Sequence, residues 1–369
     1  MTRRRAAFLG MGMGLGLGGL GLLGSCAVAP PEPPPADEGD LLWPMPPELP
    51  RYAFEVALRS TADVMEDTDA ARLQRRLTGL RLPADRLLEK PSAVAARDGR
   101  VYVTDSVRRT IVVFDVPRRR IFQFGLRAPG TLRKPMAIAI DQARRVYVAD
   151  ATLRIVLVYD ALGLFLHAIG NPSQLHRPTG VAVNGDGSRI YIIDRADNES
   201  DLHRVMAYAG DGTLLREIGK RGRREGEFNV PVQGVVSADG QLHVLDAGNF
   251  RVQSFDADGK FLRSFGSVGT GLGQFARPRG IACDREGKLF VTDAAFGNVQ
   301  IFSPHGELLL ALGRGDKRDL PGRFGLVTGV AVDETDRLYL VDQLFGKVEV
   351  IRRLPEAEGR ALQQRTASG

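Results

Sequence analysis

The sequence predicts an all-β fold built from six repeated four-stranded units. A segment of about 45 residues recurs six times between residues 90 and 354. Each copy contains short alternating runs, such as "VYVTD" and "IVVFD", separated by Gly and Asp turns, as in an antiparallel meander. The last copy has only three such runs. These observations predict a six-bladed β-propeller in which a strand from elsewhere in the chain completes the last blade.

Residues 1–25 have the pattern of a secretory signal peptide. Three arginines precede a Gly- and Leu-rich run that ends in "LLGSC", and this run is too short and too rich in glycine to span a membrane well. "LLGSC" resembles the bacterial lipobox, which implies that Cys26 becomes the lipidated first residue of the mature chain. Ala27 after it resembles Gram-negative lipoproteins of the outer membrane. "TRRRAAFLG" also resembles a twin-arginine signal, so the export route stays open.

The segments around the repeats have distinct compositions. Residues 26–50 are rich in proline and predict an extended tether. Residues 51–59, "RYAFEVALR", alternate as a strand and are expected to fill the outer place in the last blade, which would remove two open sheet edges. Residues 60–87 fit no blade, although "TDAARLQRRLTGL" within them favours a short helix. Residues 355–369 form a C-terminal tail after the propeller, which we place at 51–354.

The six copies align in register. Their first strands begin "KPSAVAA", "KPMAIAI", "RPTGVAV", "PVQGVVS", "RPRGIAC" and "LVTGVAV". The fourth residue of all six runs is Gly or Ala, which suits an innermost strand crowded at the axis: Ala93, Ala137, Gly180, Gly234, Gly280 and Gly329. Each second strand ends in aspartate: Asp105, Asp150, Asp194, Asp246, Asp293 and Asp342.

These residues carry a family resemblance. "RPxGVAVDxxGxLYVxDxxNxRVQVF" is the signature of the NHL repeat, and the six copies resemble an NHL six-bladed propeller over nearly all of residues 51–354. "LLWPMPPELPRYAFE" also resembles the start of bacterial six-bladed propeller lipoproteins. The resemblance implies a globular propeller on a membrane-anchored stalk.

The fifth copy carries Cys283, Asp293 and His305, the residue types of a cysteine nucleophile site. Register argues for scaffold instead. Cys283 aligns with apolar positions of the other first strands, Asp293 has an equivalent in every blade, and His305 lies in the turn "SPHGE". A buried Cys behaves as a small apolar residue, and a recurrent Asp accepts backbone N–H bonds at a turn. We therefore expect no catalytic residue among them.

The channel is not expected to hold a metal or a cofactor. The residues that enter the first strands are Ser92, Met136, Thr179, Gln233, Arg279 and Thr328, and none is acidic, whereas Ca²⁺ needs several oxygen ligands, carboxylates among them. The five histidines occupy unlike registers, so a three-His zinc site is not expected. Some propeller relatives are enzymes, which leaves a metal-dependent lyase or hydrolase centred on the channel as the alternative function.

The favoured function is non-catalytic binding through one face. The links between blades and from the second to the third strands are long and rich in Lys and Arg, whereas the other turns are tight, and binding concentrates in such loops. We expect a protein, or an anionic glycan or lipid of the cell envelope, to dock here. The candidate binding residues are Lys220, Arg221, Arg223, Arg224, Arg279, Gln233, Arg314, Lys317 and Arg318.

The location follows from the signal peptide and the lipobox. We expect an exported monomer, lipid-anchored to the bacterial envelope and facing the periplasm from the outer membrane. Export conflicts with binding of nucleic acid. The formal net charge of +6 also includes three arginines of the signal peptide, so the bulk charge does not favour a nucleic-acid partner either.

Overall fold

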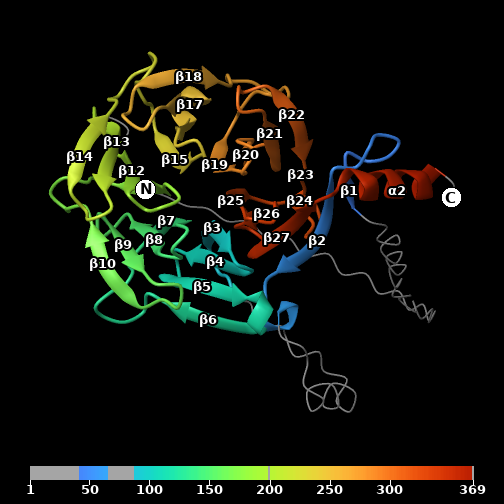
Figure 1. Cartoon of the computed structure of the whole chain (residues 1–369), viewed down its shortest axis with the longest axis horizontal. Coiled ribbons are helices and arrows are strands. Elements are labelled where there is room, and N and C mark those ends of the chain that lie inside the picture. The colour runs from blue at the N-terminus through green and yellow to red at the C-terminus, as the bar shows by residue number, and fades with distance from the viewer. Residues whose placement is uncertain (1–40, 65–86, 198–199, 368–369) are drawn as a thin grey trace, which may run out of the picture. The chain divides into compact units, whose positions relative to one another are not determined.

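The computed structural model describes residues 41–64, 87–197 and 200–367. Six antiparallel sheets follow one another around a ring, each with one strand at the centre and one at the outside (Figure 1). The first three blades comprise β3 (Pro91–Arg97), β4 (Arg100–Asp105), β5 (Thr110–Asp115) and β6 (Arg120–Phe124); β7 (Pro135–Ile140), β8 (Val146–Asp150), β9 (Ile155–Tyr159) and β10 (Phe165–Ile169); and β11 (Pro178–Val183), β12 (Arg189–Arg195), β13 (His203–Ala209) and β14 (Leu214–Ile218).

The other three blades continue the same order. They comprise β15 (Pro231–Val236), β16 (Leu242–Asp246), β17 (Arg251–Phe255) and β18 (Phe261–Phe265); β19 (Pro278–Cys283), β20 (Leu289–Asp293), β21 (Asn298–Phe302) and β22 (Leu308–Leu312); and β25 (Val327–Val332), β26 (Leu338–Asp342), β27 (Lys347–Arg353) and β2 (Tyr52–Leu58). The fold is thus the all-β six-bladed propeller that the sequence predicts.

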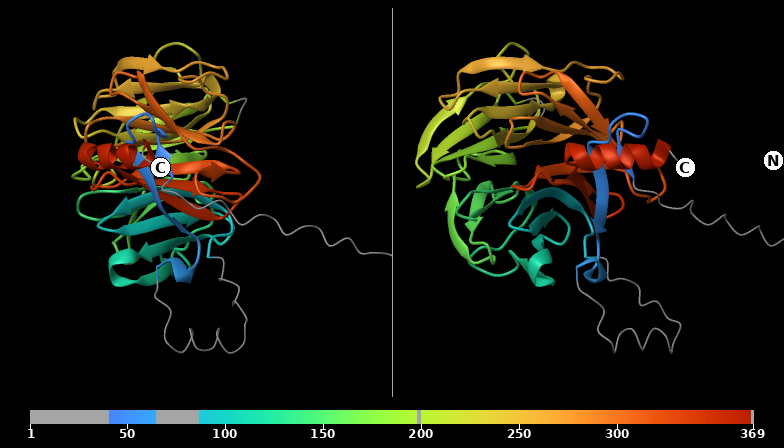
Figure 2. Two further views of the ribbon diagram at one scale, coloured as in Figure 1. Left: turned by 90° about the vertical axis from the view of Figure 1, so that its right-hand side faces the viewer. Right: turned by 45° about the vertical axis from the view of Figure 1, so that its right-hand side comes forward.

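Blade 6 combines the two ends of the propeller. β2 lies antiparallel to β27, with Tyr52 opposite Arg353 and Leu58 opposite Val348, and Figure 2 shows the blue strand beside the red sheet. β1 (Leu42–Trp43) adds a short fifth strand outside β2. The N-terminal strand therefore occupies the outer place of the last blade.

The hydrophobic core lies between neighbouring blades. Second and third strands are buried on both faces, and all six residues of β5 are buried. One cluster joins Val101 and Phe114 of blade 1 to Tyr339 and Val348 of blade 6, so the ring is closed by apolar packing. Glycines suit the axis: a Cβ at Gly280 would lie 2.5 Å from the backbone oxygen of Thr328.

In blades 1, 2, 5 and 6, a buried aspartate ties together the two connections at one end of the blade. The carboxylate of Asp293 accepts the N–H groups of Ala276 (2.8 Å) and Arg277 (2.9 Å), which precede β19, and that of Ala295 (2.9 Å), which follows β20. Asp105, Asp150 and Asp342 bond in the same pattern. The predicted turn role of this aspartate is therefore correct, and the linker before the first strand shares the same carboxylate. We call this end of the propeller the long-loop end.

Ordered structure extends beyond the segment 51–354. β1 begins at Leu42, inside the predicted tether, and α2 (Glu356–Ala367) follows the last strand, where the sequence suggested only a tail. Leu42, Ala53, Leu354 and Leu362 pack together as a small cluster of their own. Burial of these apolar side chains stabilises both β1 and α2 against the propeller.

Four predictions lie outside the described residues, in whole or in large part. They are the signal peptide, lipidation at Cys26, the extended tether as far as residue 40, and the short helix within residues 60–87, of which only η1 (Thr61–Asp63) and its immediate neighbours are described. Two further short strands, β23 (Arg314–Gly315) and β24 (Arg323–Phe324), pair within the linker before blade 6. Among the residues that the structure describes, no helix is long and apolar enough to cross a membrane.

Candidate functional site

The channel opens at the long-loop end into a polar pocket of about 270 Å³. All six residues that the register placed at the entrance of the first strands line it: Ser92, Met136, Thr179, Gln233, Arg279 and Thr328. One comes from each blade, and all six are half-buried. We call this pocket the channel mouth.

Hydrogen bonds between blades hold the ring of the mouth in place. The hydroxyl groups of Ser92 and Thr179 point to backbone oxygens in the next blade, at 3.5 Å and 3.4 Å. The amide of Gln343 donates to the backbone oxygen of Pro91 at 2.9 Å, across the seam where the ring closes. Side chains fixed in this way form a pocket that exists before any ligand binds.

The mouth is cationic. Within the described part of the chain, its lining includes Lys90, Lys134, Arg195 and Arg279 but neither Asp nor Glu. Burial, followed by the charges of Arg277 and Arg195, lowers the pKa of Arg279. Burial and then the charge of Arg177 lower the pKa of Arg195. These cations therefore oppose one another in a partly dehydrated site.

Three polar atoms at the mouth are buried without a hydrogen-bond partner among the described residues. They are Nε of Arg279, Oε1 of Gln233 and Oγ1 of Thr328. A buried donor or acceptor that stays unpaired costs about 1–3 kcal/mol. The mouth thus presents one charged donor, one acceptor and one hydroxyl group that a ligand or ordered water can satisfy.

The other predicted binding residues lie on rim loops. Lys220, Arg221, Arg223 and Arg224 belong to the linker between β14 and β15, and Arg314, Lys317 and Arg318 to the linker before blade 6; all seven are exposed and none lines the mouth. A buried side chain holds each linker in place. Oε1 of Gln253 accepts the N–H of Gly226 in the first linker at 3.0 Å, and the carboxylate of Glu349 accepts the N–H of Gly322 in the second at 3.0 Å.

Part of the rim charge is neutralised within the loops. Lys220 lies 3.8 Å from a carboxylate oxygen of Glu227, and Arg318 lies 3.3 Å from one of Asp316. The predicted set therefore divides into two mouth residues, Gln233 and Arg279, and seven residues on partly compensated loops.

The structure adds Lys90, Lys134 and Arg195 to the mouth, which the sequence-based set lacked. A signal for them existed. Lys90 and Lys134 are the "K" of "KPSAVAA" and "KPMAIAI", aligned with the "R" that opens two other blades. Arg195 follows the aspartate of its second strand, where the other blades have Ser, Ala or Gln.

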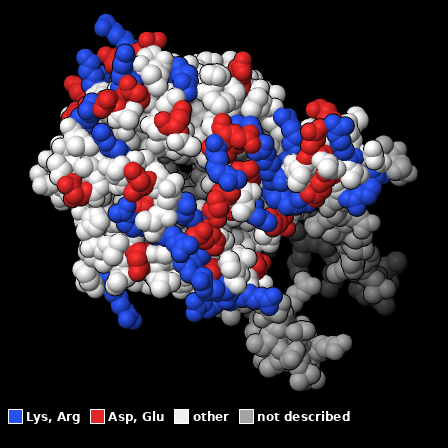
Figure 3. Space-filling view, viewed as in Figure 1, with Lys and Arg blue, Asp and Glu red and all other residues white. Residues whose placement is uncertain are grey.

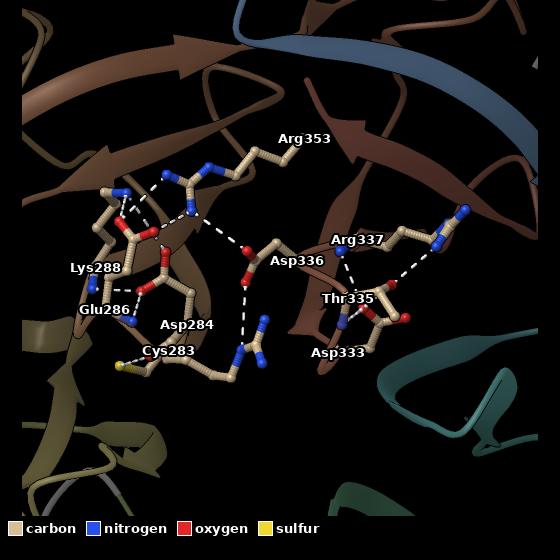
Figure 4. Close-up of polar contacts among 10 residues, drawn as sticks. Cys283, Asp284, Glu286, Lys288, Asp333, Thr335, Asp336, Arg337 and Arg353 are labelled. Atoms are coloured by element: carbon tan, nitrogen blue, oxygen red, sulfur yellow. Dashed lines mark hydrogen bonds and ion pairs between the residues drawn. The ribbon is translucent and has the colours of Figure 1, made fainter. Parts of the chain in front are cut away.

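A network of charged groups lies at the opposite, tight-turn end, between blades 5 and 6. Figure 4 shows Arg353 reaching from β27 toward Glu286 and Asp336, at 2.5 Å and 3.4 Å. The hydrogen bonds from Arg353 and Lys288 lower the pKa of Glu286 to about 2. This carboxylate is a poor proton carrier at neutral pH, and the network serves to join two blades.

A second basic cleft, of about 400 Å³, lies between the turns of blades 1 and 2. Its arginines are largely paired: Arg100 contacts Asp115 at 2.9 Å and Arg144 contacts Asp98 at 2.6 Å. Figure 3 shows Lys and Arg side chains interspersed with Asp and Glu over much of one face of the molecule. The channel mouth differs because its lining contains no carboxylate.

The residues of the suspected cysteine site are dispersed. Cys283 lies part-buried at the tight-turn end of the channel, and burial raises the pKa of its thiol to about 12. His305 is exposed in its turn, and Asp293 is fully buried at the other end of its blade. They do not form one site.

Two other histidines are fully buried. His243 contacts the hydroxyl oxygens of Ser254 at 2.8 Å and of Ser237 at 3.0 Å. His203 begins β13, because the second and third strands of blade 3 are two residues longer than in most blades. Among the described residues, no group of three or more His, Cys, Asp or Glu side chains is placed to hold a metal ion.

No protein-family model and no curated protein sequence matches this chain. Solved structures with a similar fold include a protein of unknown function from Bacteroides thetaiotaomicron (16% identity, TM-score 0.57, covering 73% of this chain and 71% of that one). A gluconolactonase from Xanthomonas campestris is 20% identical (TM-score 0.55, covering 82% and 98%). A streptogramin B lyase is 14% identical (TM-score 0.52, covering 73% and 95%). At these identities the likeness shows a β-propeller fold and nothing beyond it.

Proposed function

We propose that this chain is an NHL-type propeller lipoprotein of the cell envelope that binds an anionic ligand at the channel mouth and does not transform it. One observation carries the proposal. Among the described residues, Nε of Arg279 is buried without a partner in a pocket whose lining has four cations and no carboxylate. An anion there supplies the missing acceptor and offsets the repulsion among the cations.

The same pocket favours a ligand that also carries hydroxyl groups. Oε1 of Gln233 is an unpaired acceptor beside the cations, and the unpaired hydroxyl group of Thr328 can donate or accept. A bare inorganic anion offers them few or no donors, whereas a hydroxylated carboxylate offers an acceptor to Arg279 and donors to these oxygens. We therefore favour an acidic sugar unit of an envelope component over a small inorganic ion.

The rim loops have a different role in this proposal. Lys220, Arg221, Arg223 and Arg224 are exposed, so they attract an anionic ligand from a distance more than they hold it. Reversal of all four to Glu is expected to slow association and weaken its dependence on salt. A large rise in the dissociation rate instead would place the binding site on the rim loops.

Export and lipid anchoring through Cys26 complete the proposal, and the "LLGSC" sequence supports them. Metabolic labelling with a radioactive fatty acid tests them directly. The wild-type chain should incorporate label and sediment with membranes, and Cys26→Ser should lose both properties. A labelled Cys26→Ser chain would contradict anchoring at this residue.

Binding is tested by calorimetric titration with galacturonate, with glucose as the neutral counterpart. We expect galacturonate to bind and glucose not to bind. Arg279→Gln should lower the affinity for galacturonate about tenfold or more, because a charged hydrogen bond is lost. Arg285→Gln is the matched control, since this arginine lies on a tight turn with 68% of its side chain exposed. Equal affinities in the two variants would contradict the proposal.

A further inference from the structure

A groove of about 410 Å³ runs between blades 2 and 3 at the long-loop end. It is lined by Lys134, Ala151, Thr152, Arg154, His176, Arg177, Ala196, Asp197 and Ser200. Lys134 lines both this groove and the channel mouth. The two hollows are therefore neighbours that share a cationic wall.

The positive charge continues from the mouth into the groove. Burial is the main cause that lowers the pKa of both Arg279 and Arg195; the charge of Arg195 adds to it at Arg279, and the charge of Arg177 adds to it at Arg195. Arg195 therefore lies within electrostatic reach of both other guanidinium groups. Within residues 41–64, 87–197 and 200–367, no ion pair to a carboxylate is found for Lys134, Arg154 or Arg177. Among the residues that the structure describes, Asp197 is the only acidic one that lines the groove.

The walls of the groove are rigid. Asp150 accepts the N–H groups of Lys134 at 2.8 Å and Thr152 at 2.9 Å, on opposite connections of blade 2. Asp194 accepts that of Arg177 at 2.8 Å. Both carboxylates are fully buried, so they position the cations without offering an exposed counter-charge to them.

The lining of the groove indicates the kind of occupant. Among the described residues, the lining combines hydroxyl groups and cations with His176 and Asp197, and it has no Leu, Ile, Val, Met, Phe, Tyr or Trp side chain. A docked peptide normally places apolar or aromatic anchors in pockets, and this groove has no place for them. A chain of hydroxylated, negatively charged units needs only the cations and hydroxyls that are present.

We propose that the channel mouth and this groove form one track that binds a linear anionic glycan of the uronate type. One carboxylate contacts Arg279 in the mouth, and a later carboxylate of the same chain contacts Arg154 and Arg177 in the groove. The inference rests on the proposed function, because it takes the mouth as the first subsite. Joined subsites increase affinity with ligand length.

The test compares oligogalacturonates of one to six units by calorimetry on the purified full chain. We expect the hexamer to bind about tenfold or more tightly than the monomer. Arg154→Gln should lose much of this gain and keep the monomer affinity, whereas Arg279→Gln should weaken the binding of both ligands. Arg285→Gln, with the same change of net charge on an exposed tight turn, is the control; circular dichroism verifies folding of each variant.

The outcomes separate the two proposals. Equal affinity for monomer and hexamer would contradict the proposal that the groove is a second subsite. A groove variant that behaves as the control does would contradict it as well. Monomer binding that depends on Arg279 would still support the proposed site at the channel mouth. If wild type binds no galacturonate of any length, the proposed function fails with it. Equal binding of neutral maltohexaose overturns the anionic assignment, and tighter binding of hexaglutamate than of hexagalacturonate overturns the glycan assignment.

Discussion

His243 makes the stability of blade 4 depend on pH. Burial, followed by the charge of Arg263, lowers the pKa of this imidazole from 6.5 to about 4. The side chain is 2% exposed and lies between two serine hydroxyl groups. In the unfolded chain the same imidazole is expected to titrate near its ordinary value. Protonation therefore favours the unfolded state.

The sign and size of the effect follow from linkage. Because the folded pKa is the lower one, the stability contribution is complete above about pH 6.5 and is lost as the pH falls toward about 4. From about pH 7.5 to about pH 5 the loss is about 2 kcal/mol, and below about pH 4 it reaches about 3 kcal/mol. Urea unfolding at several pH values measures it.

His243→Phe isolates the contribution of this residue. Phe290 occupies the equivalent place in blade 5: His243 pairs with Val235, and Phe290 pairs with Ala282, in the same register. The variant should be less stable near neutral pH because Ser254 loses its partner, and its stability should fall less on acidification by about 2 kcal/mol. Parallel losses in variant and wild type between these pH values would refute the reasoning, whatever other groups titrate.

Three further variants test the scaffold. Asp293→Asn should cost about 2–4 kcal/mol in urea unfolding, because an amide cannot accept all the N–H groups that converge on this buried carboxylate; Asp258→Asn in an exposed turn is the control, and equal midpoints would contradict the role. Deletion of residues 51–59 should lower the melting temperature by more than about 10 °C, because β2 then leaves β27 as an open edge; an unchanged melt would exclude a closing role. In a Cys26→Ser background, Cys283 should react with a thiol reagent near neutral pH far more slowly when folded than in urea, because its pKa is raised to about 12; equal rates would contradict its burial.

Much of the fold is predictable because the same four-stranded unit, with the same pattern of apolar and turn residues, occurs six times in the sequence. Each feature of one copy can be checked against the five other copies: the alternating strands, the glycine at the axis and the terminal aspartate. One irregular blade therefore does not change the predicted fold. The two additions outside 51–354 have no repeat to support them. α2 and β1 depend on a four-residue apolar cluster drawn from both ends of the chain, which no local pattern reveals.

The candidate site was predictable only in part. The ring of Gln233, Arg279 and their equivalents follows from register, and the structure brings these residues together at the mouth. The density of Lys and Arg in the loops led to the prediction of Lys220 and its neighbours as binding residues. Sequence composition does not show which of these charges are paired with a carboxylate. Arg195 lies at the mouth because it directly follows Asp194 at the end of its second strand. It is partly buried beside other cations, and this environment forms only when the ring is closed, so the sequence does not reveal it.

A crystal structure of the protein with bound galacturonate tests the central claim most directly. The account predicts density for one sugar acid at the channel mouth, with its carboxylate within hydrogen-bonding distance of Nε of Arg279 and a hydroxyl group near Oε1 of Gln233. Density for the ligand on the rim loops or in the cleft at the tight-turn end, with water alone at Arg279, would contradict it.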